Sequence, residues 1–181
     1  MALPVDYDSP AGEEQAEFAI REALGACFLV VGAGFGFTSS LVHTRPRYPR
    51  TTSEWETVGT IEDPDTTGND TQTKLVRYCS FKFVGLRRLG QELTLRYQHV
   101  LSFGFKDTYA SNPSLNSHDQ MTGCAMQFSK YLSDNLNLGL DDRVTHRNLE
   151  YFDSDMIPAD KQGEAAVVLY GRIDVVLNVC H

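Results

Sequence analysis

The chain lacks the residue spacings by which most catalytic and metal sites are recognised. Its four cysteines (27, 79, 124 and 180) lie roughly fifty residues apart, so no pair has the short spacing of a zinc site or a redox dithiol. The five histidines are scattered, and no serine lies in a nucleophile-elbow motif. We therefore expect no enzyme, no bound metal and no cofactor. The cysteines are expected to be buried free thiols, with two long-range disulfides as the alternative.

Positive charge and long apolar runs are also scarce. Sixteen Lys and Arg against 24 Asp and Glu give a net charge of −8. General nucleic-acid wrapping is disfavoured, because counterion release needs clustered cations. The longest apolar run, residues 26–37, is too short to span a bilayer. The N-terminus has no basic region ahead of an apolar stretch, so no signal peptide is predicted. We expect a soluble chain, made in a cytoplasm, with no membrane partner.

The composition predicts one domain with an arm and an insertion. A chain of 181 residues, 41% of them apolar, fits a single domain. Residues 1–12 carry two prolines and no periodicity, which predicts an N-terminal arm ahead of a domain over residues 13–181. Residues 43–73 are rich in proline and polar residues, which is typical of a surface excursion.

Two segments have helical periodicity. From Glu13 onward, apolar residues recur at three-and-four spacing until the glycine-rich segment 28–37 ends the helix or follows it. A second helix is predicted over residues 118–138, introduced by a Ser117–Gln120 capping box and followed by Gly139 in a left-handed conformation. Its predicted apolar stripe consists of Met121, Cys124, Ala125, Phe128, Leu132 and Leu136.

Alternating apolar residues predict an antiparallel sheet. Segments 73–84 and 92–105 read as the two strands of a long hairpin, with residues 86–91 as the turn region. Two C-terminal strands are expected at 146–156 and 165–179. The predicted fold class is α+β: an antiparallel β-sheet, made of a long hairpin plus C-terminal strands and flanked by two α-helices, with an extended loop and arm.

The segment FLVVGAGFG at 28–36 imitates the start of a dinucleotide-binding fold. Gly32 and Gly34 fit the first two glycine positions, but Phe37 occupies the third. A following helix is excluded by Pro46 and Pro49. We expect the glycines to let a helix end turn or pack tightly, rather than to bind a nucleotide.

One polar pair keeps an alternative function open. His99 lies on the apolar side of a predicted strand, where a core histidine with satisfied hydrogen bonds is more common than a ligand. If it is not a core residue, His99 and Tyr97 would line a pocket between sheet and helix. The chain would then be a small soluble α+β ligand-binding protein or enzyme.

Arginines and aromatic residues are concentrated in HTRPRYPRTTSEWE (43–56), which two prolines hold extended. Guanidinium groups pair with carboxylates and tryptophan fills pockets, so this composition suits a protein interface as well as an exposed loop. The candidate interface residues are Arg45, Arg47, Tyr48, Arg50 and Trp55.

The order of segments resembles small bacteriophage neck proteins of the tail-terminator and head–tail connector group. The closest points are the VH-x-R-x-R start of VHTRPRYPRTTSEWE (42–56), the R-x-x-H strand in LRYQHVLSFGFKDT (95–108), and LNLGL (136–140) after the helix that opens with SHDQM (117–121). The chain departs from such proteins in its glycine-rich stretch at 32–36 and its long polar run at 63–73.

This resemblance implies a structural virion protein assembled in the host cytoplasm. It would form a homo-oligomeric ring, commonly a hexamer, that terminates the tail tube and joins it to the head connector. Its expected partners are other copies of itself, the tail tube protein and a head-completion or connector protein, with a sheath or collar protein as a further candidate. Other phage components, such as a head-completion or tube-related subunit, remain open alternatives. DNA would pass through the lumen without specific binding, since an acidic wall repels it.

Overall fold

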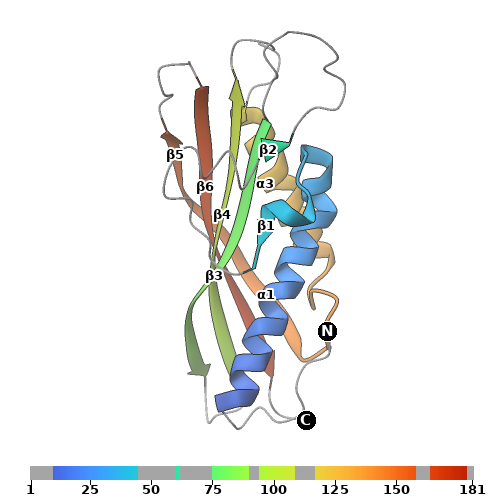
Figure 1. Cartoon of the computed structure of the whole chain (residues 1–181). Coiled ribbons are helices and arrows are strands. Elements are labelled where there is room, and N and C mark those ends of the chain that lie inside the picture. The colour runs from blue at the N-terminus through green and yellow to red at the C-terminus, as the bar shows by residue number, and fades with distance from the viewer. Residues whose placement is uncertain are drawn as a thin grey trace.

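Four long strands and two helices form the framework of the chain (Figure 1). The computed structural model describes residues 10–44, 60–61, 75–89, 94–108, 117–157 and 164–178. In chain order the elements are α1 (Pro10–Gly32), the 3-10 turns η1 (Ala33–Phe35) and η2 (Ser39–Leu41), β1 (Val42–His43), β2 (Thr60–Ile61), β3 (Leu75–Leu89), β4 (Thr94–Thr108), α3 (Ser117–Asp134), β5 (Val144–Ile157) and β6 (Glu164–Asn178). The predicted α+β class is confirmed.

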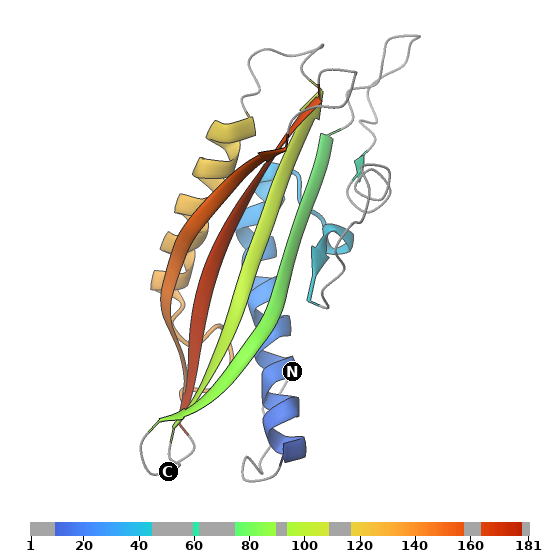
Figure 2. The ribbon, with the colours of Figure 1, turned by 90° about the vertical axis from the view of Figure 1, so that its left-hand side faces the viewer.

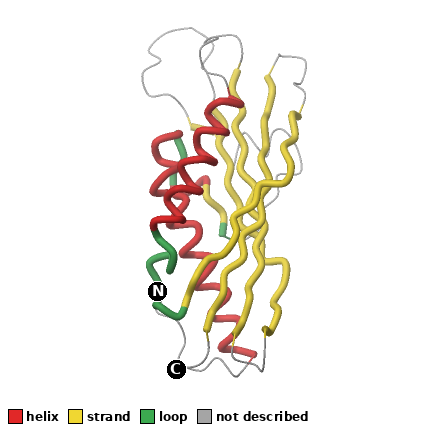
Figure 3. The backbone as a smooth tube through the Cα atoms, turned by 180° about the vertical axis from the view of Figure 1, so that it is seen from behind, coloured by secondary structure: helices red, strands yellow, loops and turns green. Residues whose placement is uncertain are grey.

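The long strands form an antiparallel sheet in the order β3-β4-β6-β5, and both helices cover the same face of it (Figures 2 and 3). The two-residue strand β1 pairs in parallel with β3, and β2 pairs with the start of β3. The predicted hairpin and the pairing of its second strand with the C-terminal strand are both confirmed. The division into an arm and one domain stays a prediction.

The predicted turn over residues 86–91 is wrong for residues 86–89, and residues 90–91 lie outside the described residues. Strand β3 continues to Leu89, which pairs with Thr94 of β4. The ladder shifts register at a bulge between Phe83 and Gly85, after which Leu86 lies opposite Tyr97. The bulge adds a residue to the strand, and the two arginines that follow resemble turn composition in the sequence.

Helix α1 begins at Pro10, three residues before the predicted start, because proline is well suited to a first helical turn. The segment 28–37 ends the helix as expected. Gly36 has φ 84°, and a Cβ added to Gly32 would lie 2.9 Å from Phe28 Cε1. Gly32 therefore allows close packing and Gly36 allows the left-handed turn, as expected for glycines that do not bind phosphate.

Helix α3 ends at Asp134, four residues before the predicted end. Leu136 lies beyond the helix and its side chain is 56% exposed, so its assignment to the buried stripe is wrong. Gly139 is left-handed as predicted, with φ 70°, and Leu138 also has a positive φ of 58°. The polar run after Ser133 favours an early end of the helix. The other five stripe residues are buried in the core.

Between the helices and the sheet, the core is built around phenylalanines. The Phe28 ring lies 5.0 Å from Phe37 and 5.2 Å from Phe128, both edge to face. Phe81 of β3 lies 6.2 Å from Phe28 and 6.4 Å from Phe128. Such pairs stabilise beyond their buried area. This cluster therefore joins α1, α3 and the sheet.

By length and composition, the segment Pro10–Phe35 would also be able to cross a membrane. In the structure its residues Ile20, Leu24 and Phe28 are fully buried in the protein core. Part of its apolar surface therefore packs inside the protein, with 44% of the apolar window buried.

Candidate functional site

The five predicted interface residues (Arg45, Arg47, Tyr48, Arg50 and Trp55) lie outside the described residues. The structure does show where the chain leading to them is anchored. Val42 pairs with Cys79 of β3, and the Thr44 hydroxyl donates a hydrogen bond to Glu22 of α1. The interface role of the five residues stays a prediction.

Tyr97 and His99, the residues of the alternative function, are buried in the core between β4 and α1. Both are at most 1% exposed. The Tyr97 hydroxyl donates to the Glu13 carbonyl at 3.3 Å, and His99 Nε2 lies 3.3 Å from Glu17 Oε1. His99 Nδ1 has no partner in the described structure. These contacts hold α1 on the sheet, and neither side chain reaches solvent.

A second buried polar contact involves Arg77, which is 2% exposed. Its Nε donates to the Phe35 carbonyl at 2.8 Å, and its Nη2 donates to Gln120 Oε1 at 2.9 Å. One guanidinium group therefore ties the end of α1 and the start of α3 to strand β3. Sequence periodicity gave no sign of this role, because the two bonded residues lie 42 and 43 positions away.

Three cysteines are free and buried, as expected; Cys180 lies outside the described residues. Burial raises the pKa of Cys27 to about 11 and that of Cys124 to about 12, in the latter case against the opposing effect of Arg77. Burial likewise raises the pKa of Cys79 well above its ordinary value. A nucleophilic thiolate is therefore disfavoured at all three positions.

Among the described residues, no group of three or more histidine, cysteine or carboxylate side chains is placed to hold a metal ion. His146, which the sequence places near Asp141 and Asp142, lies on β5, and its Nε2 is 2.6 Å from the Leu132 carbonyl. Asp141 instead accepts hydrogen bonds from the Arg143 side chain.

An exposed apolar surface lies on the second half of α1. No charged residue occurs from Ala23 to Phe37. Ala26, Val30 and Ala33, which we call the uncharged α1 face, are nevertheless exposed, Val30 by 63%. On α3, Met126 is 69% exposed. A helix that is apolar all round is usually buried all round, so the exposure of these residues is unusual for such a helix.

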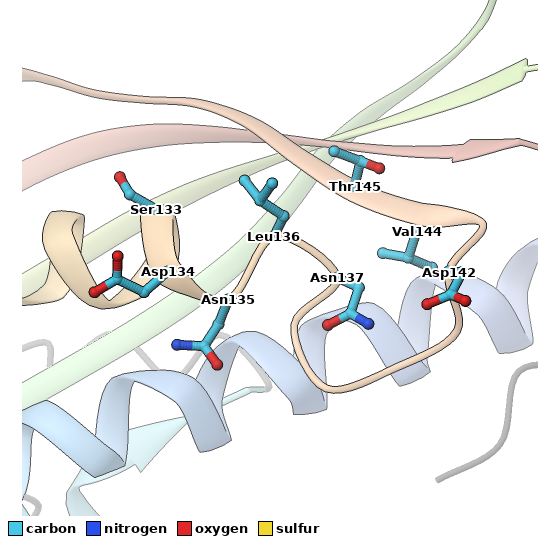
Figure 4. A pocket seen from close by; sticks show the side chains of 8 residues that line it. All are labelled: Ser133, Asp134, Asn135, Leu136, Asn137, Asp142, Val144 and Thr145. Carbon is cyan, nitrogen blue, oxygen red and sulfur yellow. The ribbon is translucent and has the colours of Figure 1, made fainter.

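A pocket of about 440 Å³ opens where α3 leads into β5. Figure 4 shows Asp134 and Asp142 at its two ends, with Leu136 and Asn137 between them. Ser133, Asn135, Val144 and Thr145 complete the lining. We call it the acidic pocket. It presents two carboxylates and one exposed leucine, which suits a basic and partly apolar side chain.

Charge is distributed unevenly between the two layers. The helix layer, taken as residues 10–44 and 117–143, holds more carboxylates (Glu13, Glu14, Glu17, Glu22, Asp119, Asp134, Asp141 and Asp142) than cations (Arg21, Lys130 and Arg143). Strand β3 has four cations (Arg77, Lys82, Arg87 and Arg88) and no carboxylate. The molecule therefore has an acidic helix side and a basic edge strand.

No known protein family matches the chain, and no curated protein matches it. Among solved structures, it is similar to a chain of the "Virion of native gene transfer agent (GTA) particle". The similarity covers 86% of this chain and 93% of that chain, with 13% sequence identity and a TM-score of 0.40. A similarity at this level does not carry an inference about function, which has to come from the chain itself.

Proposed function

We propose that the chain is a structural, non-enzymatic subunit of a bacteriophage neck. It forms a ring, with six copies as the expected number, that ends the tail tube and joins it to the head connector. The proposed position in the neck rests on the resemblance of the order of segments to that of tail-terminator and connector proteins. The assembly role comes from its surface.

The observation that carries the assembly role is the uncharged α1 face. Val30 is 63% exposed within a stretch of fifteen residues that has no charge. Leaving such a surface in water costs free energy that burial against another chain recovers. Because α1 is already held on the sheet by its opposite side, its exposed side is available to an external partner.

The net charge of −8 is consistent with a protein that lines a channel through which DNA passes. A ring that transmits DNA should not grip it, and carboxylates facing the lumen prevent tight binding by repulsion. On this proposal, the acidic helix side contributes to the lumen, and the basic β3 edge is turned toward a protein neighbour.

Light scattering on the purified chain, with Val30→Asp and Gln127→Asp as a matched pair, tests the proposal. Both positions are exposed on helices, so both variants are expected to fold, as judged by far-UV circular dichroism. We expect the parent and Gln127→Asp to form rings or to bind the ends of tail tubes, and Val30→Asp to do neither. A parent chain that remains a 20.2 kDa monomer and does not bind tail tubes would contradict the proposal.

A further inference from the structure

The two edge strands of the sheet are β3, which is basic, and β5, which lies beside the acidic pocket. Among the described residues, part of β3 and all of β5 have a strand on one side only. On β3, residues 81–89 have β4 on one side and no described strand on the other, because β1 and β2 pair only with positions 75–80. On the opposite side of the sheet, β5 pairs with β6 alone. The acidic pocket lies at the start of β5.

The backbone geometry of both edges disfavours direct pairing with a strand of another chain. Strand β3 is bulged between Phe83 and Gly85, and β5 is bulged at two places, between Arg147 and Leu149 and between Tyr151 and Asp153. Bulges interrupt the hydrogen-bonding row that an added strand would need. A neighbour is therefore expected to meet these edges through side chains.

The β3 edge carries a positive charge, on Arg87, that forms no ion pair among the described residues. Arg87 is exposed and lies directly opposite Arg96 of β4. Like charges in this position destabilise an antiparallel pair. No ion pair of Arg87 occurs in the described part of the chain, whereas Arg88 is paired with Glu13 and Arg96 with Asp174. Exposed apolar groups, Val84 and Leu89, flank Arg87 along the same edge.

The acidic pocket carries the complementary groups. Asp142 is exposed and has no ion pair within the described ranges, because its neighbour Asp141 takes the Arg143 side chain. Asp134 is paired with Lys130 at 3.0 Å, but both side chains are more than 60% exposed, so the pair is weak. Leu136 supplies an apolar surface that matches Leu89 in kind.

The strand pairing places Arg87 and Leu89 of the β3 edge at the same height along the strands as the acidic pocket beside β5. The row that begins at Arg87 runs through Arg96 and Val176 to Thr145, which lines the acidic pocket. The row from Leu89 runs through Thr94 to Asn178, whose amide donates to the Arg143 carbonyl beside Asp142. Groups at one level on opposite edges meet when copies are arranged side by side in a flat ring.

We propose that the β3 edge of one copy docks into the acidic pocket of the next, with Arg87 between Asp134 and Asp142 and with Leu89 against Leu136. The occupant of the pocket is thus a second copy of this chain. This contact is head to tail, and repeating it closes a ring when the rotation between successive copies adds up to a full turn. The inference rests on the proposed ring and names one contact within it, in addition to the burial of the uncharged α1 face.

Charge reversal tests the contact. Arg87→Glu and Asp142→Arg should each weaken self-association at least tenfold, measured by sedimentation equilibrium, while each variant still folds. Arg87→Glu should fold at least as stably as the parent, since it removes the repulsion from Arg96. The control is Arg172→Gln, which removes the charge of an exposed arginine on central strand β6 without placing two glutamates opposite each other at Glu150, and which should change self-association less than twofold.

Rescue completes the test. The double variant R87E/D142R should assemble like the parent, because each contact again pairs opposite charges. An equimolar mixture of the two single variants should also assemble, with native and reversed contacts alternating. If the parent forms rings that Arg87→Glu leaves intact, the contact is wrong and the proposed function stands. If the parent neither self-associates nor binds tail tubes, the proposed function itself fails.

Discussion

Replacing Phe128 with alanine probes the packing that holds the two helices on the sheet. Its side chain is fully buried, 5.2 Å from the Phe28 ring and 6.4 Å from the Phe81 ring. Truncation of a buried phenylalanine costs about 3–5 kcal/mol, and each lost edge-to-face pair adds roughly 0.5–1.5 kcal/mol to the loss of buried area. We therefore expect a loss near the upper end of that range.

Urea unfolding at a protein concentration where both chains are monomeric measures this loss. For a chain of this size, it corresponds to a fall in Tm of roughly 6–20 °C. The control is Met126→Ala on the same helix, where the side chain is 69% exposed and the expected change is within about 0.5 kcal/mol. A loss below about 1 kcal/mol for Phe128→Ala would show that the cluster does not carry the core.

Three further predictions concern the glycines, the buried arginine and the thiols. Gly32→Ala should destabilise the folded chain by roughly 1–3 kcal/mol, because the added Cβ would lie within 3.2 Å of two phenylalanines. Gly34 has open space around it, so Gly34→Ala should change stability by less than about 0.5 kcal/mol in the same urea assay. Arg77→Ala should cost at least about 2 kcal/mol, since it removes a buried guanidinium group and leaves the Phe35 carbonyl and the Gln120 side chain without their donor. Arg77→Lys should recover only part of this loss, and equal stability of all three chains would refute the buried contact. Cys27 and Cys124 should resist Ellman's reagent at pH 8 until the chain unfolds, because pKa values of about 11 and 12 leave roughly a thousandth or less of each thiol ionised. Rapid labelling of either thiol in the folded protein, mapped by mass spectrometry, would count against their burial.

Local periodicity was sufficient to predict the main elements. Alternation along β4 and β6 fixed which residues face the helices, and the spacing from Met121 to Leu132 fixed the buried side of α3. The errors lie at ends of elements, where local signals compete. Two arginines and a glycine at 87–90 resemble a turn, but β3 continues beyond a bulge and through both arginines to Leu89.

The candidate surfaces needed the fold. His99 and Glu17 are 82 residues apart, and no sequence pattern connects them. The acidic pocket likewise depends on the early end of α3, which exposes Leu136 and places Asp134 and Asp142 in the lining of one pocket. The match in level between Arg87 and this pocket depends on the register of three strand pairs. The arginine-rich segment 43–56, from which the sequence predicted an interface, lies mostly outside the described residues.

The central claim is that copies of this chain join head to tail into a closed ring. Cryo-electron microscopy of the assembled wild-type chain tests it most directly, since a map shows symmetry and contacts together. We predict a ring with cyclic symmetry in which Arg87 of each copy lies within ion-pair distance of Asp142 of the next. A chain that remains a 20.2 kDa monomer both alone and in the presence of tail tubes, or one that assembles into open fibres instead of rings, would contradict the claim.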